Sequence, residues 1–263
     1  MNNPFFQAVD KPEFMGAAQQ EALSRMNHVV ETKSLGVLTG EVGSGKSTLL
    51  RTLAGVLCAS DHQVIYLCSS RMSPKDLYAS ILRNMGEVPF FSTSKIKQQW
   101  HEIMEDRTRV QSRYLVVKHN AAYDMPNTTL LELRFLMTRG MEAQSPFPVI
   151  LAGQAKLRRD LNTNLMEPIS QRIRMQYHLS GMTVTECQQY VDQRMKSAGL
   201  ERPVFTESAI KQIYSTTQGV PRLLNMLCGN SLILAIQKTD NAVEDRHVTA
   251  VLADLDRQRG NIN

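Results

Sequence analysis

The chain has 263 residues, 42% of them hydrophobic and 21% charged, with a formal net charge of +5. This composition excludes an intrinsically disordered chain and allows one large domain, or a domain with a smaller appendage. Four scattered cysteines without histidines at metal-ligand spacing argue against a zinc site, and the lack of a long apolar run predicts a cytoplasmic protein with no membrane partner.

Short apolar runs alternate with helix-length segments up to residue 181. The amphipathic spacing of QQEALSRMNHVVE predicts a helix near the N-terminus. The runs that predict buried strands are LGVLTG (35–40), VIYLC (64–68), YLVV (114–117), PVILAG (148–153) and MQYHL (175–179). Five strands that alternate with helices indicate an α/β fold with a parallel sheet.

Only helix signals follow Gly181. In chain order they are a capping box at Thr183–Glu186, a cap at Thr206, a stop at Gly219, a start at Pro221 and the run VEDRHVTAVLADLDRQ. We therefore expect an α/β domain over residues 1–181, whose residues 1–33 form an entry segment and helix. A smaller, all-helical domain is expected over residues 182–263.

A glycine-rich loop follows the first expected strand. The residues from Gly40 to Ser47 match G-x-x-x-x-G-K-[ST], and a plausible helix, TLLRTLAGVL, comes next. In such a loop backbone N–H groups surround phosphate oxygens, Lys46 reaches the β and γ phosphates, and Ser47 offers its hydroxyl to Mg²⁺. We expect ATP and Mg²⁺ as cofactors, held by Gly40, Glu41, Val42, Gly43, Ser44, Gly45, Lys46, Ser47 and Thr48. A glycine-rich turn without a ligand is the alternative.

The third expected strand lacks the acids that follow it in other P-loop ATPases. There the strand ends in Asp, which holds Mg²⁺ through water, and in one large branch a Glu follows and polarises the attacking water. Here His119 stands at the metal position and Asn120 at the catalytic position. Neutral imidazole suits a hard cation poorly, and an amide cannot accept the proton of water. We expect ATP binding to survive and hydrolysis to be weak or lost, unless Asp124, otherwise a loop or cap residue, substitutes.

Ordered motifs extend over nearly the whole chain. They are GEVGSGKSTLLRTL, LRFLMTRGM, SPFPVILAGQAKLRRDL, EPISQRIRMQYHLSGMTVTECQQYV and GVPRLLNMLC. In this order they resemble the AAA+ ATPases of the ExeA/TniB/TnsC type. The resemblance implies an AAA+ P-loop NTPase fold, with a five-stranded parallel sheet of strand order 5-1-4-3-2 flanked by helices and a small all-helical C-terminal lid domain.

The same resemblance implies partners and an activity. Members related to transposition assemble with ATP into rings or helical filaments on double-stranded DNA, select target sites and recruit a transposase. A secretion-related branch couples ATP to envelope assembly. We expect the transposition-regulator activity; the alternatives are an active ATPase of the ExeA-like secretion type and a scaffold that needs no nucleotide.

The resemblance also assigns roles to single residues. Gln154 matches sensor 1, between the γ-phosphate and the attacking water, and Arg222 matches sensor 2; Arg172 and Arg174 fall where the family places arginines near a neighbour's nucleotide. The expected catalytic residues are Lys46, Gln154, Arg172, Arg174, Arg222 and Asn120, and Arg222 is also expected to bind the nucleotide. Gln154 has the alternative of a plain strand-end residue, and the arginines at 172 and 174 that of solvated or structural groups. Basic residues cluster in RTRVQSR (107–113), AKLRR (155–159) and QRIR (171–174), and Lys95 and Lys97 stand beside Trp100. Contact with DNA is assigned to the assembly and to none of these segments in particular.

Overall fold

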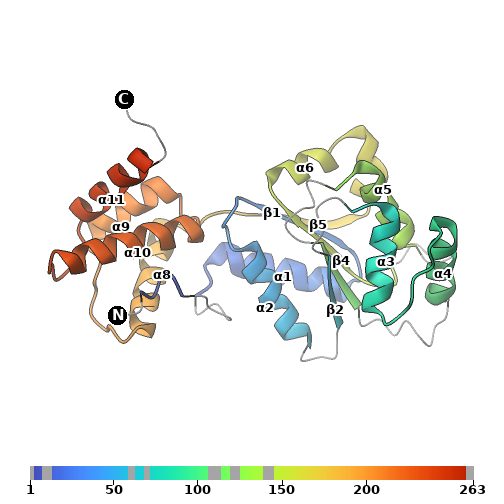
Figure 1. The fold of residues 1–263 in the computed structure, drawn as a ribbon, viewed down its shortest axis with the longest axis horizontal. Helices are drawn as coiled ribbons and strands as arrows, with labels where there is room; N and C mark the ends of the chain where they lie inside the picture. Colours follow the sequence, from blue (N-terminus) through green and yellow to red (C-terminus); the bar gives the residue numbers. More distant parts are fainter. Residues whose placement is uncertain are drawn as a thin grey trace. The chain divides into compact units, whose positions relative to one another are not determined.

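The computed structural model describes residues 3–7, 14–58, 63–67, 72–105, 114–118, 125–138 and 145–258. These residues form two compact units (Figure 1). Each unit has its own hydrophobic core. The α/β unit holds the described residues of 21–42 and 46–179, and the helical unit holds those of 1–20, 43–45 and 180–263. The described residues of 1–20 therefore belong to the same compact unit as those of 180–263. The division into two domains at residues 181 and 182 stays a prediction.

A five-stranded parallel sheet forms the centre of the α/β unit. Its strands are β1 (Leu35–Gly40), β2 (Gln63–Leu67), β3 (Tyr114–Lys118), β4 (Val149–Gly153) and β5 (Ile173–Leu179). Their order is β2-β3-β4-β1-β5, which confirms the expected order. The neighbours β1 and β4 are buried along their whole length, as the uninterrupted apolar runs predict.

The start of β5 was predicted too late. The strand begins at Ile173 and not at Met175, because Ile173 pairs with Leu35 before a register shift brings Gly36 opposite Met175. This irregularity depends on the partner strand, so the apolar run in β5 alone could not reveal it.

Helices cover both faces of the sheet. They are α1 (Ala17–Glu31), α2 (Lys46–Cys58), α3 (Pro74–Asn84), α4 (Thr93–Glu105), α5 (Asn127–Leu136), α6 (Ala155–Leu161), η2 (Asn164–Met166) and α7 (Glu167–Ser170). On one face, Leu35 and Val37 of β1 share a core with Trp100 of α4. On the other face, Gly36 lies against Val29 of α1, where an added Cβ would come within 2.7 Å of a methyl group. Side chains that alternate along β1 thus anchor two layers of helices.

The helical unit is built from α8 (Val184–Ser197), α9 (Glu207–Thr217), α10 (Pro221–Gln237) and α11 (Asp245–Gln258). The expected caps are confirmed: the hydroxyls of Thr183 and Thr206 accept hydrogen bonds from the first turns of α8 and α9, and Pro221 is the first residue of α10. The break between α9 and α10 comes from Gln218 and Gly219, whose φ angles of 49° and 69° cannot continue a helix.

The segment from Asn3 to Gln7 packs into the helical unit. Phe5 is 3% exposed and meets the ring of Phe205 edge to face, with 5.8 Å between ring centroids. The buried guanidinium of Arg194 on α8 donates hydrogen bonds to the carbonyl oxygens of Pro4 and Gln7. A buried cation is stable only with such acceptors, so Arg194 holds the segment in place.

No helix of the described residues combines the length and the apolar character that a bilayer-spanning segment needs. The carboxylates, histidines and cysteines of the same residues form no group of three or more that could hold a metal ion. Cys187 and Cys228 are buried thiols without a disulfide, and burial raises the pKa of Cys187 to about 11. These two thiols therefore act as core residues.

Candidate nucleotide-binding site

The glycine-rich loop lies at the carboxyl edge of the sheet. β1 ends at Gly40 and α2 begins at Lys46, as the motif predicts. Gly43 and Gly45 have φ angles of 87° and 98°, a region that residues with a Cβ rarely adopt. Such a turn directs successive backbone N–H groups inward, toward the place of an anion at the N-terminus of α2.

Lys46 is held against this loop. Its side chain is only 7% exposed, and Nζ donates to the carbonyl oxygens of Gly40, at 2.8 Å, and Glu41, at 2.7 Å. An anionic phosphate oxygen is a stronger acceptor than a carbonyl, so a nucleotide phosphate is a favourable partner for this ammonium group. Ser47 is exposed in the first turn of α2, where its hydroxyl suits Mg²⁺. The loop residues therefore fit the phosphates of ATP with Mg²⁺.

Arg222 lies in the first turn of α10 and contacts Gly43. Its backbone N–H donates to the carbonyl oxygen of Gly43 at 3.2 Å, and both residues belong to the helical unit by their contacts. A Cβ at Gly43 would lie 2.5 Å from the Cβ of Arg222, so the contact requires glycine. The side chain of Arg222 is exposed. Its role as sensor 2 stays a prediction.

Gln154 follows β4 at the same edge of the sheet. Thr39 of β1 pairs with Gly153 of β4, so the next residues, Gly40 and Gln154, leave their strands side by side. Gln154 is half-buried and its side chain makes no capping hydrogen bond to α6. A polar side chain that is not used to cap the helix is available to a ligand at this edge. Its role as sensor 1 stays a prediction.

Sequence reasoning missed a contact that fixes the end of β1. Thr39 is 1% exposed, and its hydroxyl lies 3.4 Å from the carbonyl oxygen of Tyr177 and 3.1 Å from Nδ1 of His178, both on β5. This contact joins β1 to β5 one residue before the glycine-rich loop. Strand register was needed to find it, because the sequence gives no sign that residues 39 and 178 meet.

Arg172 and Arg174 lie at the opposite, amino edge of the sheet. Ile173 pairs with Leu35 at the start of β1, whereas the loop follows the end of β1. Five residues at ~3.3 Å each separate the two edges by roughly 17 Å. The structure therefore does not bring these arginines to the end of β1, where the glycine-rich loop of their own copy begins.

The two arginines differ in their contacts. Arg172 donates to the carbonyl oxygen of Arg134, at 2.7 Å, and to the hydroxyl of Thr138, at 2.8 Å, so it holds the C-terminal end of α5. Partial burial and the nearby charge of Arg134 lower the pKa of Arg172. The side chain of Arg174 is exposed and makes no hydrogen bond or ion pair among the described residues. Both arginines line a polar cavity of about 730 Å³, together with Lys33 and Gln171.

Other expected residues contribute less or lie outside the described ranges. The described residues do not include 119–124, where His119, Asn120 and Asp124 lie, or 106–113, which contain the basic segment 107–113. The roles inferred for these residues stay predictions. Lys97, one of the basic residues considered for DNA contact, forms a 2.6 Å ion pair with Glu132, which is only 8% exposed and also accepts a hydrogen bond from Tyr78. This pair ties α4 to α5.

The sequence is similar to a known protein family and to two known proteins. A family model described as an AAA domain matches residues 27–161, just over half of the chain. General secretion pathway protein A of Aeromonas hydrophila is 26% identical over 249 residues, which cover 92% of the chain and 45% of that protein. An uncharacterized HTH-type transcriptional regulator of Methanocaldococcus jannaschii is 22% identical, over 83% of the chain and 62% of that protein. The chain thus spans less than two thirds of either relative.

Solved structures share the fold. Cdc6p of Pyrobaculum aerophilum has a TM-score of 0.68 at 15% identity, with 92% of the chain and 68% of that protein covered. The ORC1 protein of Aeropyrum pernix in complex with DNA has a TM-score of 0.62 at 14% identity, with 97% of the chain and 69% of that protein covered. The RuvB Holliday junction branch migration motor of Thermotoga maritima has a TM-score of 0.58 at 16% identity, covering 97% and 74%. At these identities the likeness concerns the fold alone.

Proposed function

The chain belongs to the AAA domain family, and on that premise we propose that it is an ATP-dependent assembly switch that acts on double-stranded DNA. In this proposal ATP binding orders copies of the chain into a ring or helical filament on DNA. The assembly then acts as a transposition regulator, which selects target sites and recruits a transposase. A cytoplasmic location and an α/β domain followed by a helical lid domain are parts of the same proposal.

The separation between the two edges of the sheet carries the proposal. The phosphate-binding loop follows β1, whereas Arg172 and Arg174 precede or begin β5 at the opposite edge, roughly 17 Å away. Arginine side chains cannot span that distance, so arginines that act on a nucleotide must act on one held by another copy. A nucleotide completed by a neighbour couples ATP binding to self-association, because ATP then binds the assembled state more tightly.

Each residue of the proposed site would have a separate role. Bound Mg-ATP would supply the γ-phosphate that is transferred to water. Lys46 and the backbone N–H groups of the loop hold the phosphates, and Ser47 is the metal ligand. Gln154 orients a water at the carboxyl edge, and Arg222 contacts the phosphates from α10. Arg174 of a neighbouring copy stabilises the charge on the γ-phosphate.

Weak hydrolysis is a further part of the proposal, because His119 and Asn120 replace the expected acids. The test is ATP binding and steady-state phosphate release, with and without double-stranded DNA, in the unaltered chain and in His119→Asp/Asn120→Glu. We expect tight binding with little turnover, and turnover regained in the double variant. Rapid turnover in the unaltered chain that disappears in Asp124→Ala but persists in Asn120→Ala would instead identify a working ATPase that uses Asp124.

The action on DNA is supported by the resemblance to transposition regulators and by the positive net charge. The experiment is light scattering and electron microscopy of the protein with a non-hydrolysable ATP analogue, with and without double-stranded DNA. We expect extended or ring-shaped particles that form with the analogue and bind DNA less tightly as salt rises. Particles of the same size in Lys46→Ala would contradict nucleotide-dependent assembly and favour a scaffold.

The similarity to general secretion pathway protein A favours a second candidate, an ATPase of the secretion type. That candidate predicts nucleotide-dependent assembly and hydrolysis that do not respond to DNA. The light-scattering and microscopy experiment distinguishes the two candidates, because it compares assembly with and without double-stranded DNA. Assembly that is unchanged by double-stranded DNA at low salt would support the secretion type over the transposition regulator.

A further inference from the structure

The loop between α3 and α4 exposes a compact group of apolar side chains, which we name the apolar tip (Val88–Phe91). Val88 is 84% exposed and Phe91 is 90% exposed, the two largest values among the large hydrophobic side chains that the structure describes. Phe90, between them, is 53% exposed. Single exposed hydrophobic residues are ordinary, but a cluster of this kind marks a contact surface.

The apolar tip is held in one shape. The side-chain amide of Gln99 on α4 accepts a hydrogen bond from the backbone N–H of Phe90, at 3.2 Å, and donates one to the carbonyl oxygen of Val88, at 3.0 Å. The ammonium group of Lys75 on α3 lies 3.9 Å from the centroid of the Phe91 ring. A tip fixed in this way loses little conformational entropy when it enters a partner.

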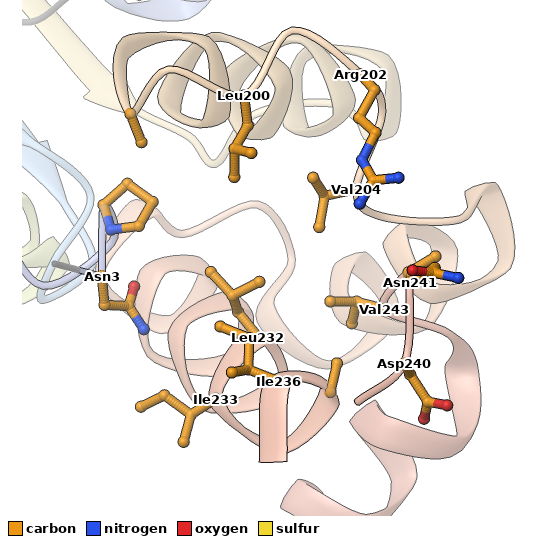
Figure 2. Close-up of a pocket in the computed structure, with 14 residues that line it drawn as sticks. Asn3, Leu200, Arg202, Val204, Leu232, Ile233, Ile236, Asp240, Asn241 and Val243 are labelled. Atoms are coloured by element: carbon orange, nitrogen blue, oxygen red, sulfur yellow. The ribbon is translucent and has the colours of Figure 1, made fainter. Parts of the chain in front are cut away.

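The helical unit contains a cavity that suits such a tip, which we name the helical pocket. Its volume is about 190 Å³. Figure 2 shows the apolar side chains that face its interior, Leu200, Val204, Leu232, Ile233, Ile236 and Val243. A dry cavity of about 150 Å³ lined by such side chains can hold a benzene ring, so the helical pocket has room for one phenyl group.

The surroundings of tip and pocket are complementary in charge. Arg202 and Asp240 stand at the rim of the helical pocket, as Figure 2 shows. Glu87 directly precedes the apolar tip, and Lys75 stands over Phe91. Asp240 already forms an ion pair with Arg246, at 3.1 Å, and a hydrogen bond with His247, at 2.8 Å, in its own copy. The charge match therefore rests on Arg202 beside the pocket and Glu87 beside the tip, and this match favours the pairing with a second copy of the chain.

We propose that the apolar tip of one copy enters the helical pocket of the next copy, with the Phe91 ring in the cavity. This inference rests on the self-association proposed above and names the surfaces that carry it. Because tip and pocket are different surfaces, the contact is head-to-tail, and repetition of such a contact gives a ring or a helical filament.

The test uses two single variants that each remove one surface. Phe91→Asp places a charge on the apolar tip, and Ile236→Asp places one beside the helical pocket, where Ile236 is already 49% exposed and its replacement leaves the core intact. Leu165→Asp is the matched control, since Leu165 is 55% exposed on η2 and belongs to neither surface. Sedimentation velocity with the non-hydrolysable ATP analogue measures association, and binding of a fluorescent ATP analogue confirms that each variant is folded.

We expect both variants to bind the nucleotide normally and to self-associate at least about thirtyfold more weakly, the effect of losing a central interface residue. The control should assemble like the unaltered chain. An equal mixture of Phe91→Asp and Ile236→Asp provides the sharper result. In the mixture, a Phe91→Asp chain keeps an intact pocket and an Ile236→Asp chain keeps an intact tip. One chain of each kind can therefore associate, and the mixture should form one-to-one dimers and nothing larger.

The outcomes separate this inference from the function on which it rests. An unaltered chain that stays monomeric with every nucleotide overturns both. An unaltered chain that assembles, with either variant assembling equally well, overturns only the tip-and-pocket contact. Normal assembly of Phe91→Asp with loss of DNA binding would assign the tip to DNA and overturn the contact as well.

Discussion

The two edges of the parallel sheet carry groups of the same kind in different arrangements. At the carboxyl edge Lys46 is buried and bonded to the carbonyl oxygens of Gly40 and Glu41. At the amino edge Arg174 is exposed and has no partner among the described residues, although it lines a polar cavity. The ammonium group of Lys46 is positioned by its own chain to bind a phosphate in the same copy. The guanidinium of Arg174, which has no partner among the described residues, is available to contact another copy.

The largest expected effect is on the carboxyl edge. Lys46→Ala should weaken ATP binding on the order of a hundredfold, because it removes a charge-assisted hydrogen bond to phosphate from a largely buried position. Lys33→Gln is the matched control at the amino edge and should bind ATP normally. Calorimetric titration with ATP measures both. Similar losses in the two variants would show that the edges do not differ in this way.

Arg174→Ala probes the amino edge. It should leave ATP binding by the monomer unchanged within about twofold and should weaken ATP-dependent assembly about tenfold, since a charged contact to a neighbour's nucleotide contributes about 1.5 kcal/mol or more. Nucleotide titration at low protein concentration and sedimentation at high concentration separate the two readouts. Weakened ATP binding by the monomer would place Arg174 in the site of its own copy.

A glutamine stands at each edge, which allows a milder comparison. In the His119→Asp/Asn120→Glu background, Gln154→Ala should lower phosphate release about fivefold with unchanged ATP affinity, because one neutral hydrogen bond contributes about 1 kcal/mol. Gln171→Ala, on the amino edge, should not change the rate per assembled copy. Equal rates in the two variants would exclude Gln154 as a sensor of the bound phosphate.

The smallest effect distinguishes the two arginines. Arg172→Ala removes hydrogen bonds to Arg134 and Thr138 and should lower the free energy of unfolding by about 1 kcal/mol. Arg174→Ala should change that free energy by less than about 0.5 kcal/mol. Urea denaturation followed by circular dichroism measures both changes. Equal stability of the two variants would mean that Arg172 does not anchor the end of α5.

Local patterns predicted most of the fold. The uninterrupted apolar runs of β1 and β4 indicated buried strands, and the capping box at Thr183 fixed the start of α8. The glycine-rich motif located the turn between β1 and α2. Strand order came from the resemblance of ordered motifs and not from periodicity, which carries no information on which strands are neighbours.

Features that depend on distant contacts escaped prediction. The early start of β5 needs its partner strand, and the anchoring of Arg172 needs the end of α5. The exposure of Phe91 also escaped prediction, since the apolar residues of Val88–Phe91 do not show by their order whether the side chains are buried or exposed. Sequence spacing therefore located the binding loop, and tertiary structure was needed to tell an anchored arginine from an available one.

The buried Arg194 also constrains the order in which the protein folds. Its acceptors, the carbonyl groups of Pro4 and Gln7, are 190 and 187 residues away along the chain. During synthesis the whole of the α/β unit emerges before the helical unit can close around its first residues, and closing so long a loop is slow compared with local pairing. We therefore expect the sheet to form first on the ribosome and the helical unit to complete its core last, when Phe5 enters it.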